Sequence, residues 1–352
     1  MKTSNSNKHG LTIRGDSLYC PLSFQLDTYN NCLTDCWQCY FRRLNHVWGK
    51  QLNPVNPEAL HRKLVNGLKN PNPKSSLAWA IKGKKVLRLG NKVDAFQRVE
   101  QKMKVTEKCL DVLGTLDWPL FIQTKFTTQL LKNLDRLADF SQLWVLSIIS
   151  CGLEKDWEIL ERKRTVPVEK RLKHLNQLRD ELGITVGVNG EPFIPGYHTT
   201  QDFERTMKLL NKWKITSYNV YNFHWNDFIA KRLVALGIDI ERIWHYNRDE
   251  PWKKILLQLI EIAKKYNIDL GCPDFVNSGG AFYQTMNTCC GLEVTNPTTF
   301  NTHVWKRMVQ EGRDKKEILK ETWDGVGDYD EGEKVLFGKK SDFYTFKDID
   351  GL

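Results

Sequence analysis

Short apolar segments, rich in β-branched residues, alternate with longer segments of helical periodicity through most of this chain of 352 residues. Strands that alternate with helices build a parallel sheet, because each helix carries the chain back to the same end of the sheet. Six such strands are predicted, at residues 22–26, 86–89, 120–124, 144–149, 184–188 and 216–221. Six strand–helix units predict an α/β fold, a partial (β/α)6 TIM-like barrel that is open on one side.

The segments between these strands are predicted helices, at residues 57–68, 100–113, 128–137, 168–182, 200–213 and 227–236. The pattern changes near residue 250. A helix at 252–265 and a short strand at 268–271 lead into an irregular run rich in Gly, Asn, Thr and Pro, and a helical stretch follows at 303–311. We therefore expect a flexible tail over residues 1–19, the barrel over 20–240, and a C-terminal cap and tail over 241–352.

Three cysteines, Cys32, Cys36 and Cys39, follow the first predicted strand with the spacing C-x3-C-x2-C. Reactive groups of a parallel barrel lie at the carboxyl ends of its strands, which is where these cysteines stand. Three thiolates from one loop can bind three irons of a [4Fe–4S] cluster and leave the fourth iron without a protein ligand. The amino and carboxylate groups of S-adenosylmethionine (SAM) can chelate such an open iron, and reduction then releases a 5′-deoxyadenosyl radical.

Other uses of these cysteines fit the sequence less well. A zinc site usually combines two pairs of ligands, and only Cys36 and Cys39 form a C-x2-C pair near the N-terminus. A disulfide framework is not expected for nine cysteines, an odd number, without a secretory signal. No apolar run approaches the roughly 20 residues that span a bilayer. We expect a cytoplasmic protein that does not contact a membrane.

Every later predicted strand also ends in polar residues. The candidates for ligand contacts and chemistry are Asn91, Lys125, Ser147, Asn189, Tyr221 and His224. An ammonium group such as that of Lys125 can pair with the carboxylate of SAM, and hydroxyl or amide groups can bind its amino and ribose groups. The alternatives are a solvated lysine at a strand end and, for His224, a structural histidine at the barrel mouth.

The order of several short motifs resembles the spore photoproduct lyase branch of the radical SAM superfamily. The motifs cover about residues 20–240 and comprise Gly90…Asp94…Gln97…Glu100, Gln123-Thr-Lys125, Leu134-Asp-Arg-Leu137, Ser147, Glu161-Arg162, Pro167…Arg171-Leu172 and Pro192-Phe-Ile-Pro-Gly196. The resemblance implies that the three cysteines ligate the cluster. It also implies that Lys125, Asn91 and Ser147 lie near the methionine part of SAM.

Two features differ from the pattern of that branch. The residue before the third cysteine is usually an aromatic that packs against the SAM adenine; here it is Gln38, so a flanking aromatic, Trp37 or Tyr40, has to substitute. The lyases also carry a hydrogen-donating cysteine near the end of the second strand, and this chain has none between Cys39 and Cys109. Reversal of thymine dimers is therefore the less favoured activity.

Without that thiol, the substrate radical has to be quenched by another hydrogen donor or has to rearrange. A rearrangement that regenerates SAM requires no separate thiol. The alternative hydrogen donors are a C-terminal cysteine or a tyrosine such as Tyr218 or Tyr221. Further cysteines near the C-terminus, Cys272, Cys289 and Cys290, have a spacing that suits an auxiliary metal cluster or, equally, buried structural thiols.

Composition favours a polyanionic partner. The formal net charge is +10, and twelve tryptophans supply aromatic planes of the kind that stack on bases. We predict a radical SAM enzyme of the lyase or isomerase type that acts on a nucleobase or base substituent in DNA, including a modified thymidine as in phage DNA. An external electron donor of the flavodoxin or ferredoxin type is implied. The alternatives are a radical SAM enzyme acting on RNA, a peptide or a small molecule, and a structural iron–sulfur or zinc protein that binds nucleic acid.

Overall fold

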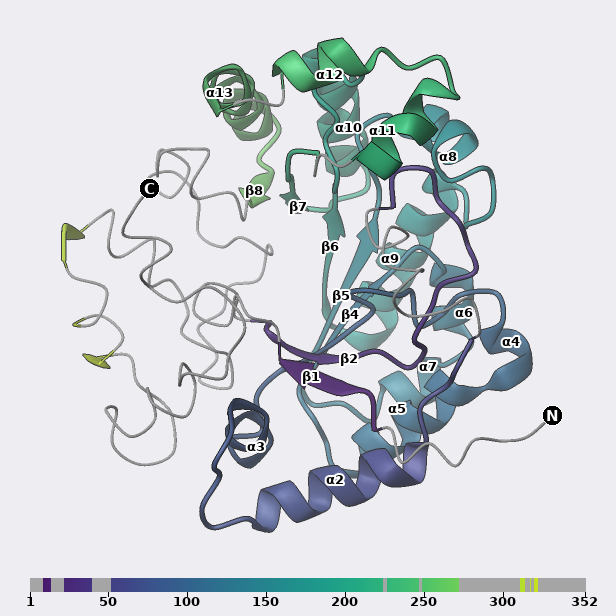
Figure 1. Cartoon of the computed structure of the whole chain (residues 1–352), viewed down its shortest axis with the longest axis vertical. Helices are drawn as coiled ribbons and strands as arrows, with labels where there is room; N and C mark the ends of the chain where they lie inside the picture. The colour runs from purple at the N-terminus through teal and green to yellow at the C-terminus, as the bar shows by residue number, and fades with distance from the viewer. Residues whose placement is uncertain are drawn as a thin grey trace.

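The computed structural model describes residues 9–13, 22–39, 52–223, 227–246, 249–271, 311–313, 317 and 320–321. Its centre is a curved eight-stranded sheet whose strand order follows the chain from β1 to β8 (Figure 1). The strands are β1 (Leu11–Ile13), β2 (Phe24–Leu26), β3 (Leu87–Leu89), β4 (Leu120–Thr124), β5 (Leu143–Ile148), β6 (Thr185–Asn189), β7 (Ser217–Asn219) and β8 (Asp269–Gly271). Neighbours from β2 to β8 are parallel, and β1 is antiparallel to β2.

The predicted α/β barrel is confirmed, since β2 to β7 are the six predicted strands in the predicted order. Two parts of the sheet differ from the predicted division of the chain. Residues 11–13, within the predicted flexible tail, form the edge strand β1, because Leu11 is buried opposite Leu26. The strand predicted at 268–271 is β8, which extends the barrel sheet beside β7 although it lies in the predicted cap. The domain boundary at residue 240 stays a prediction.

Most helices in the described residues cover the outer side of the sheet. The helices are α2 (Pro57–Lys69), α3 (Ser76–Lys82), α4 (Glu100–Met103), α5 (Val105–Thr115), α6 (Thr127–Leu131), α7 (Leu134–Leu137), α8 (Glu154–Ile159), α9 (Val168–Leu182), α10 (Thr200–Lys212), α11 (Asp227–Val234), α12 (Ile240–Tyr246) and α13 (Asp249–Lys265). Helices α11 and α12 instead form a separate apolar cluster with the loops that follow β6 and β7. For example, α9 packs on β5 and β6, and α13 packs on α10 (Figure 1). No helix in this part of the chain is both long and apolar enough to cross a membrane.

Local capping explains where several helices begin and end. The side chain of Asn56 accepts hydrogen bonds from the first N–H groups of α2, and Thr199 and Asp202 form a capping box at the start of α10. The helix predicted at 100–113 is split into α4 and α5, because Lys104 adopts a left-handed conformation with φ of 51°. The helix predicted at 128–137 is likewise split into α6 and α7.

Side chains alternate between two faces of the sheet. The outer face packs against the helices and forms the large apolar core, which includes Leu89, Ile122 and Val188. The inner face, which lines the barrel, has a small apolar plug formed by Leu22, Val86, Phe121 and Leu146. Most other inner-face residues of the parallel strands are polar, and they are described below.

Candidate active site and metal centre

The cysteine loop, residues 31–39, follows β2 and is held by the side chain of Gln97. The Gln97 amide donates through Nε2 to the carbonyl oxygen of Asn31 at 2.9 Å and accepts through Oε1 from the backbone N–H of Leu33 at 2.8 Å. Gln97 is buried, so both hydrogen bonds are shielded from water. The first turn of the loop, which carries Cys32, is therefore fixed to the segment that follows β3.

The three cysteines of the loop are free thiols that lie close enough to influence one another electrostatically. Cys36 is buried, whereas Cys32 and Cys39 are partly buried. Burial raises the pKa of the Cys32 and Cys36 thiols, and the positive charge of Lys125 opposes the rise at Cys36. Metal binding at the loop therefore has to displace thiol protons.

Asp35, between Cys32 and Cys36, ties the cysteine loop to distant parts of the chain. Its carboxylate pairs with Arg162 at 2.9 Å and with Arg232 of α11 at 3.0 Å, and Arg164 approaches to 3.6 Å. The guanidinium groups of Arg162 and Arg232 also approach the ring of Trp37, one of the two predicted adenine contacts, to 5.6 and 4.8 Å from its centroid. The outer side of the loop is thus held by a cluster of arginines.

Lys125, at the carboxyl end of β4, lies beside the cysteine loop in a buried ionic network. Its Nζ contacts Glu161 Oε1 at 2.6 Å, and the Glu161 carboxylate also pairs with the guanidinium of Arg171 and accepts from Thr165. Burial opposes ionisation of Glu161, but the charges of Arg171 and Lys125 outweigh it and lower its pKa to about 2. Burial likewise opposes the charge on Lys125, and the charge of Glu161 outweighs it, so the pKa of Lys125 is raised. Both groups are ionised at neutral pH.

The lowered pKa of Glu161 predicts a loss of stability in acid. Because its pKa falls from 4.5 to about 2 on folding, the ionised carboxylate contributes about 3 kcal/mol above pH 4.5, and this contribution disappears as the pH falls toward 2. Urea unfolding of the cluster-free chain at pH 6, 4 and 3 measures it, with Glu161→Gln as the comparison. The stability difference between wild type and Glu161→Gln is expected to shrink steadily below pH 4.5. A difference that is independent of pH would contradict the predicted ionisation.

Asp94 links the end of β3 to the end of β4. Its carboxylate accepts from the Thr124 hydroxyl, the backbone N–H of Lys125 and the backbone N–H of Phe96, at 2.7, 2.7 and 3.0 Å. Burial raises its pKa, and these hydrogen bonds oppose the rise. Asp94 therefore fixes the backbone from which Lys125 reaches toward Cys36.

Two of the predicted ligand residues lie at the carboxyl ends of the parallel strands. Asn91 follows β3 and donates through Nδ2 to Gln25 Oε1 of β2 at 3.0 Å. Asn189, the last residue of β6, is buried and accepts through Oδ1 from the backbone N–H of Glu191 at 3.0 Å. The structure thus brings Asn91, Lys125 and Asn189 to the same carboxyl edge of the sheet, on neighbouring or nearby strands.

Ser147 and Tyr218 are not brought to the inner face. Ser147 alternates with Leu146 of the inner plug, is fully buried, and donates to the carbonyl oxygen of Thr124 at 3.2 Å. The ring of Tyr218 packs edge-on against Phe203 of α10 in the outer core, and burial raises its pKa well above the ordinary value. Both side chains point toward the helices because the side-chain period of a strand is two residues.

One more predicted site residue, Tyr221, lies in the described part of the structure. Tyr221 follows β7, and its carbonyl oxygen accepts from the backbone N–H of Phe193 at 2.7 Å. The other predictions lie outside the described residues: Tyr40, His224, Cys272, Cys289 and Cys290.

The structure also shows a buried polar pair that sequence reasoning did not single out. His198 Nε2 lies 2.8 Å from Asp156 Oδ2, and His198 Nδ1 accepts from the backbone N–H of Ile194 at 2.9 Å, which leaves Nε2 as the donor. Ser150 also donates to Asp156. The pair joins α8, which follows β5, to the loop that follows β6, and 42 residues separate its members in sequence, so no local motif marks it.

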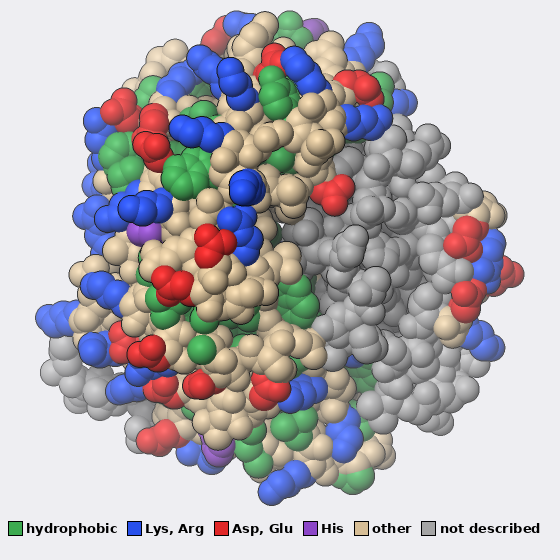
Figure 2. All heavy atoms as spheres, turned by 180° about the vertical axis from the view of Figure 1, so that it is seen from behind, with side chains coloured by type: hydrophobic (Ala, Val, Ile, Leu, Met, Phe, Trp, Pro, Cys, Tyr) green, Lys and Arg blue, Asp and Glu red, His purple; other side chains and the backbone are tan. Residues whose placement is uncertain are grey.

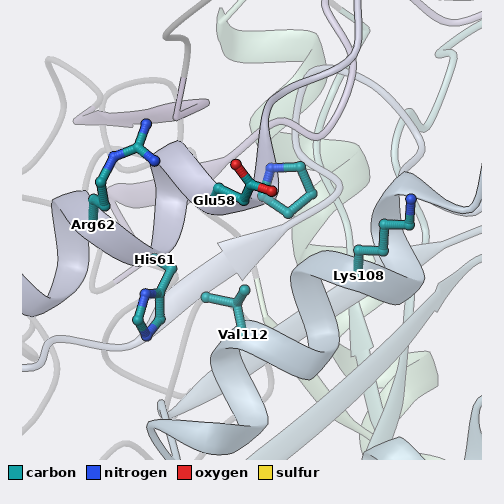
Figure 3. A pocket seen from close by; sticks show the side chains of 6 residues that line it. Glu58, His61, Arg62, Lys108 and Val112 are labelled. Carbon is teal, nitrogen blue, oxygen red and sulfur yellow. The ribbon is translucent and has the colours of Figure 1, made fainter.

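A shallow depression of about 420 Å³ lies between α2 and α5, on the outside of the barrel (Figure 3). Pro57, Glu58, His61, Arg62, Lys108 and Val112 line it. None of the predicted site residues contributes to this depression, so it is separate from the site described above.

No protein-family model matches the chain, and no curated protein is significantly similar to it in sequence. Solved structures, however, share its fold. Spore photoproduct lyase complexed with dinucleoside spore photoproduct superimposes with a TM-score of 0.53 at 12% identity, over 74% of this chain and 79% of the lyase. A variant of that lyase with bound AdoMet and the same dinucleoside superimposes with a TM-score of 0.53 at 11% identity, over 77% of this chain and 80% of the lyase. The chain therefore has the fold of spore photoproduct lyase, the branch of the radical SAM superfamily that its motifs resemble.

Proposed function

We propose that this protein is a radical SAM enzyme that binds a [4Fe–4S] cluster through Cys32, Cys36 and Cys39. One observation carries the proposal: three free thiols on one fixed loop stand at the carboxyl end of a parallel barrel of the spore photoproduct lyase fold. When bound, the cluster would supply the electron that cleaves SAM and releases a 5′-deoxyadenosyl radical.

The residues of the loop fit a cluster that each cysteine contacts through a different iron. Within the described ranges, no three His, Cys, Asp or Glu side chains lie close enough to share a single metal ion. Cluster binding does not require such a group, because the thiolates stand at separate corners of the cube. Lys125 lies close enough to Cys36 to favour its thiolate form. Burial of Cys36 shields its side of the loop from water.

Anaerobic reconstitution of the full chain with iron and sulfide tests this proposal. The expected result is a [4Fe–4S] species whose spectrum changes when SAM is added, with release of 5′-deoxyadenosine on reduction. Tightly bound zinc without either effect would instead support a structural role for the cysteines.

Lys125 is proposed to bind the carboxylate of SAM. Its ammonium group has three donors, of which one is directed to Glu161 at 2.6 Å, so donors remain for a second carboxylate. Lys125→Ala is expected to weaken SAM binding about 10- to 100-fold, the size expected for one charge-assisted hydrogen bond. Isothermal titration of the reconstituted, unreduced protein with SAM measures this. Lys173→Ala, which removes an exposed lysine of α9, is the matched control and should bind SAM as wild type does. Unchanged affinity in Lys125→Ala would remove Lys125 from the proposed site.

The proposed substrate is a nucleobase or base substituent in DNA. The solved relative of the same fold is a complex with a dinucleoside, and the net charge of +10 suits a polyanion. Lysine and arginine side chains are interspersed with acidic ones on the face shown in Figure 2. Of the thiols that the structure describes outside the cysteine loop, Cys109 and Cys151 are buried, and burial raises the pKa of both. We therefore favour a rearrangement over thiol-quenched dimer reversal.

Two experiments separate this substrate from RNA, a peptide or a small molecule. Oligonucleotide binding should weaken steeply with salt if phosphates are contacted. Incubation with deuterated nucleosides, including modified thymidines, should transfer label into 5′-deoxyadenosine. Transfer from a peptide or free small molecule, with none from nucleosides, would assign the substrate to that other class.

A further inference from the structure

The inner face of the barrel is unusually polar above its apolar plug. A closed TIM barrel is normally filled with branched apolar side chains. Here one residue of each of four parallel strands places a polar side chain on the inner face near its carboxyl end: Gln25 of β2, Arg88 of β3, Gln123 of β4 and Asn189 of β6. Polar groups buried in such a place require partners, either from the protein or from a ligand.

Arg88 stands out in this group because its charge is not compensated. One amino group of its guanidinium contacts Gln123 Oε1, and the guanidinium carbon lies 6.0 Å from the centroid of Phe121 in the plug. Both of these partners are neutral, and Arg88 Nε is buried without a hydrogen-bond partner. Within the described residues no carboxylate pairs with Arg88. The fully buried Arg171, by contrast, is paired with Glu161.

A second unpartnered donor lies on the adjacent strand. Gln25 is fully buried and is the register partner of Arg88. The Oε1 atom of Gln25 accepts a hydrogen bond from Asn91 Nδ2 at 3.0 Å. The other end of the Gln25 amide is therefore the N–H₂ group. Its nitrogen, Nε2, is buried without a hydrogen-bond partner. Two buried donors on adjacent strands, Arg88 Nε and Gln25 Nε2, therefore have no acceptor, and one of them belongs to a charged group. A ligand that completes them must bring acceptor oxygens and negative charge.

The depth of Arg88 distinguishes this position from that proposed for SAM. Arg88 is in register with Phe121, four residues before Lys125 along β4. At about 3.3 Å per residue, the Arg88 backbone lies roughly 13 Å deeper in the barrel than that of Lys125. Lys125 is the cation that lies beside Cys36. The Arg88 guanidinium itself reaches Gln123, two residues before Lys125, so an anion bound there would lie deeper in the barrel than a group bound by Lys125.

We propose that Arg88 and Gln25 bind an anionic group of the substrate, a carboxylate or a phosphate. This inference rests on the proposed function, since it assumes that the substrate occupies the barrel interior. It narrows the substrate class to molecules that carry a negative charge, such as a nucleotide or a base with an acidic substituent, and it disfavours a neutral nucleoside.

The first test uses inorganic phosphate and acetate as probes of the reconstituted full chain. Arg88→Met removes the charge and keeps an apolar stem on Phe121; Arg98→Met removes an exposed arginine and is the matched control. Without added anion, Arg88→Met is expected to melt about 2 °C above wild type, because an uncompensated charge is removed. An excess of phosphate or acetate should raise the melting temperature of wild type and Arg98→Met, but not that of Arg88→Met. A lower melting temperature for Arg88→Met without anion, or equal stabilisation of all three proteins by both probes, would overturn the proposal.

The second test identifies the source of the anion. With SAM saturating and no reductant, thymidine 5′-monophosphate or 5-carboxymethyl-2′-deoxyuridine should bind at least about 10-fold more tightly than thymidine, and Arg88→Met should remove that preference. Gln25→Met should reduce the preference in part. SAM affinity should be the same in wild type and Arg88→Met. A 10-fold loss of SAM affinity in Arg88→Met would assign the guanidinium to the carboxylate of SAM. Equal binding of the nucleotide, the carboxylated nucleoside and thymidine would remove the anion site. Cluster content, measured separately, reports whether the proposed function itself has failed.

Discussion

Replacing Cys36 with Ala is expected to abolish SAM cleavage and to leave less than a full cluster after reconstitution. Cys36 is the buried member of the three cysteines, and the positive charge of Lys125 favours its thiolate form. Without its thiolate, a [4Fe–4S] cluster has only two protein ligands, which does not retain a cube with a single open iron. Iron and acid-labile sulfide analysis, together with chromatographic measurement of 5′-deoxyadenosine, gives both readouts.

The control for this prediction is another buried cysteine. Cys109 lies in α5 within the outer core, and burial raises the pKa of its thiol. Cys109→Ala should therefore lower stability modestly while leaving iron, sulfide and SAM cleavage unchanged. Full cluster content in Cys36→Ala would show that the loop does not hold the cluster as proposed.

The largest effect on stability is expected from Arg171→Met. Arg171 is fully buried in α9 and donates to Glu161, to Thr165 and to the carbonyl oxygens of Val166 and Ile148. Its removal leaves Glu161 buried with Lys125 as its remaining cationic partner. Breaking a buried pair in this way typically costs about 3–5 kcal/mol, and equilibrium urea unfolding of the cluster-free chain measures it.

The double variant Arg171→Met/Glu161→Leu separates charge from packing. If the cost arises from an undercompensated carboxylate, removing the carboxylate as well should restore part of the lost stability. A double variant that is less stable than Arg171→Met would contradict the undercompensated carboxylate as the source of the cost, because both variants lack the Arg171 hydrogen bonds to the carbonyl oxygens of Val166 and Ile148.

The fold could be predicted well from the sequence because its signal is local. β4 was predicted with the bounds that the structure shows, and α9 likewise, since each has a clear period and a clear boundary. The predicted element boundaries were wrong where the backbone conformation depends on one residue or on a very short segment. The left-handed Lys104 divides one predicted helix into two, and the three-residue strand β1 is too short for its alternation to be recognised.

The site could be predicted only in part, because its contacts are made across the chain. The C-x3-C-x2-C spacing predicts the cysteine loop, and the position of Lys125 directly after the strand at 120–124 predicts its place in the site. The partner of Lys125, Glu161, is 36 residues away, and Arg232 reaches Asp35 across 197 residues, so neither contact has a sequence signature. The orientation of Tyr218 was available from alternation: its neighbours Ser217 and Asn219 are polar, which places Tyr218 on the opposite, helix-facing side.

The central claim is that three cysteines leave one iron open to SAM. Electron–nuclear double resonance of the reduced, reconstituted protein with SAM labelled at its amino nitrogen and carboxylate tests it most directly. We expect hyperfine coupling of both labelled groups to the cluster, retained in Cys109→Ala. A cluster that shows no coupling to bound SAM, or a protein that holds zinc and no inorganic sulfide, would contradict it.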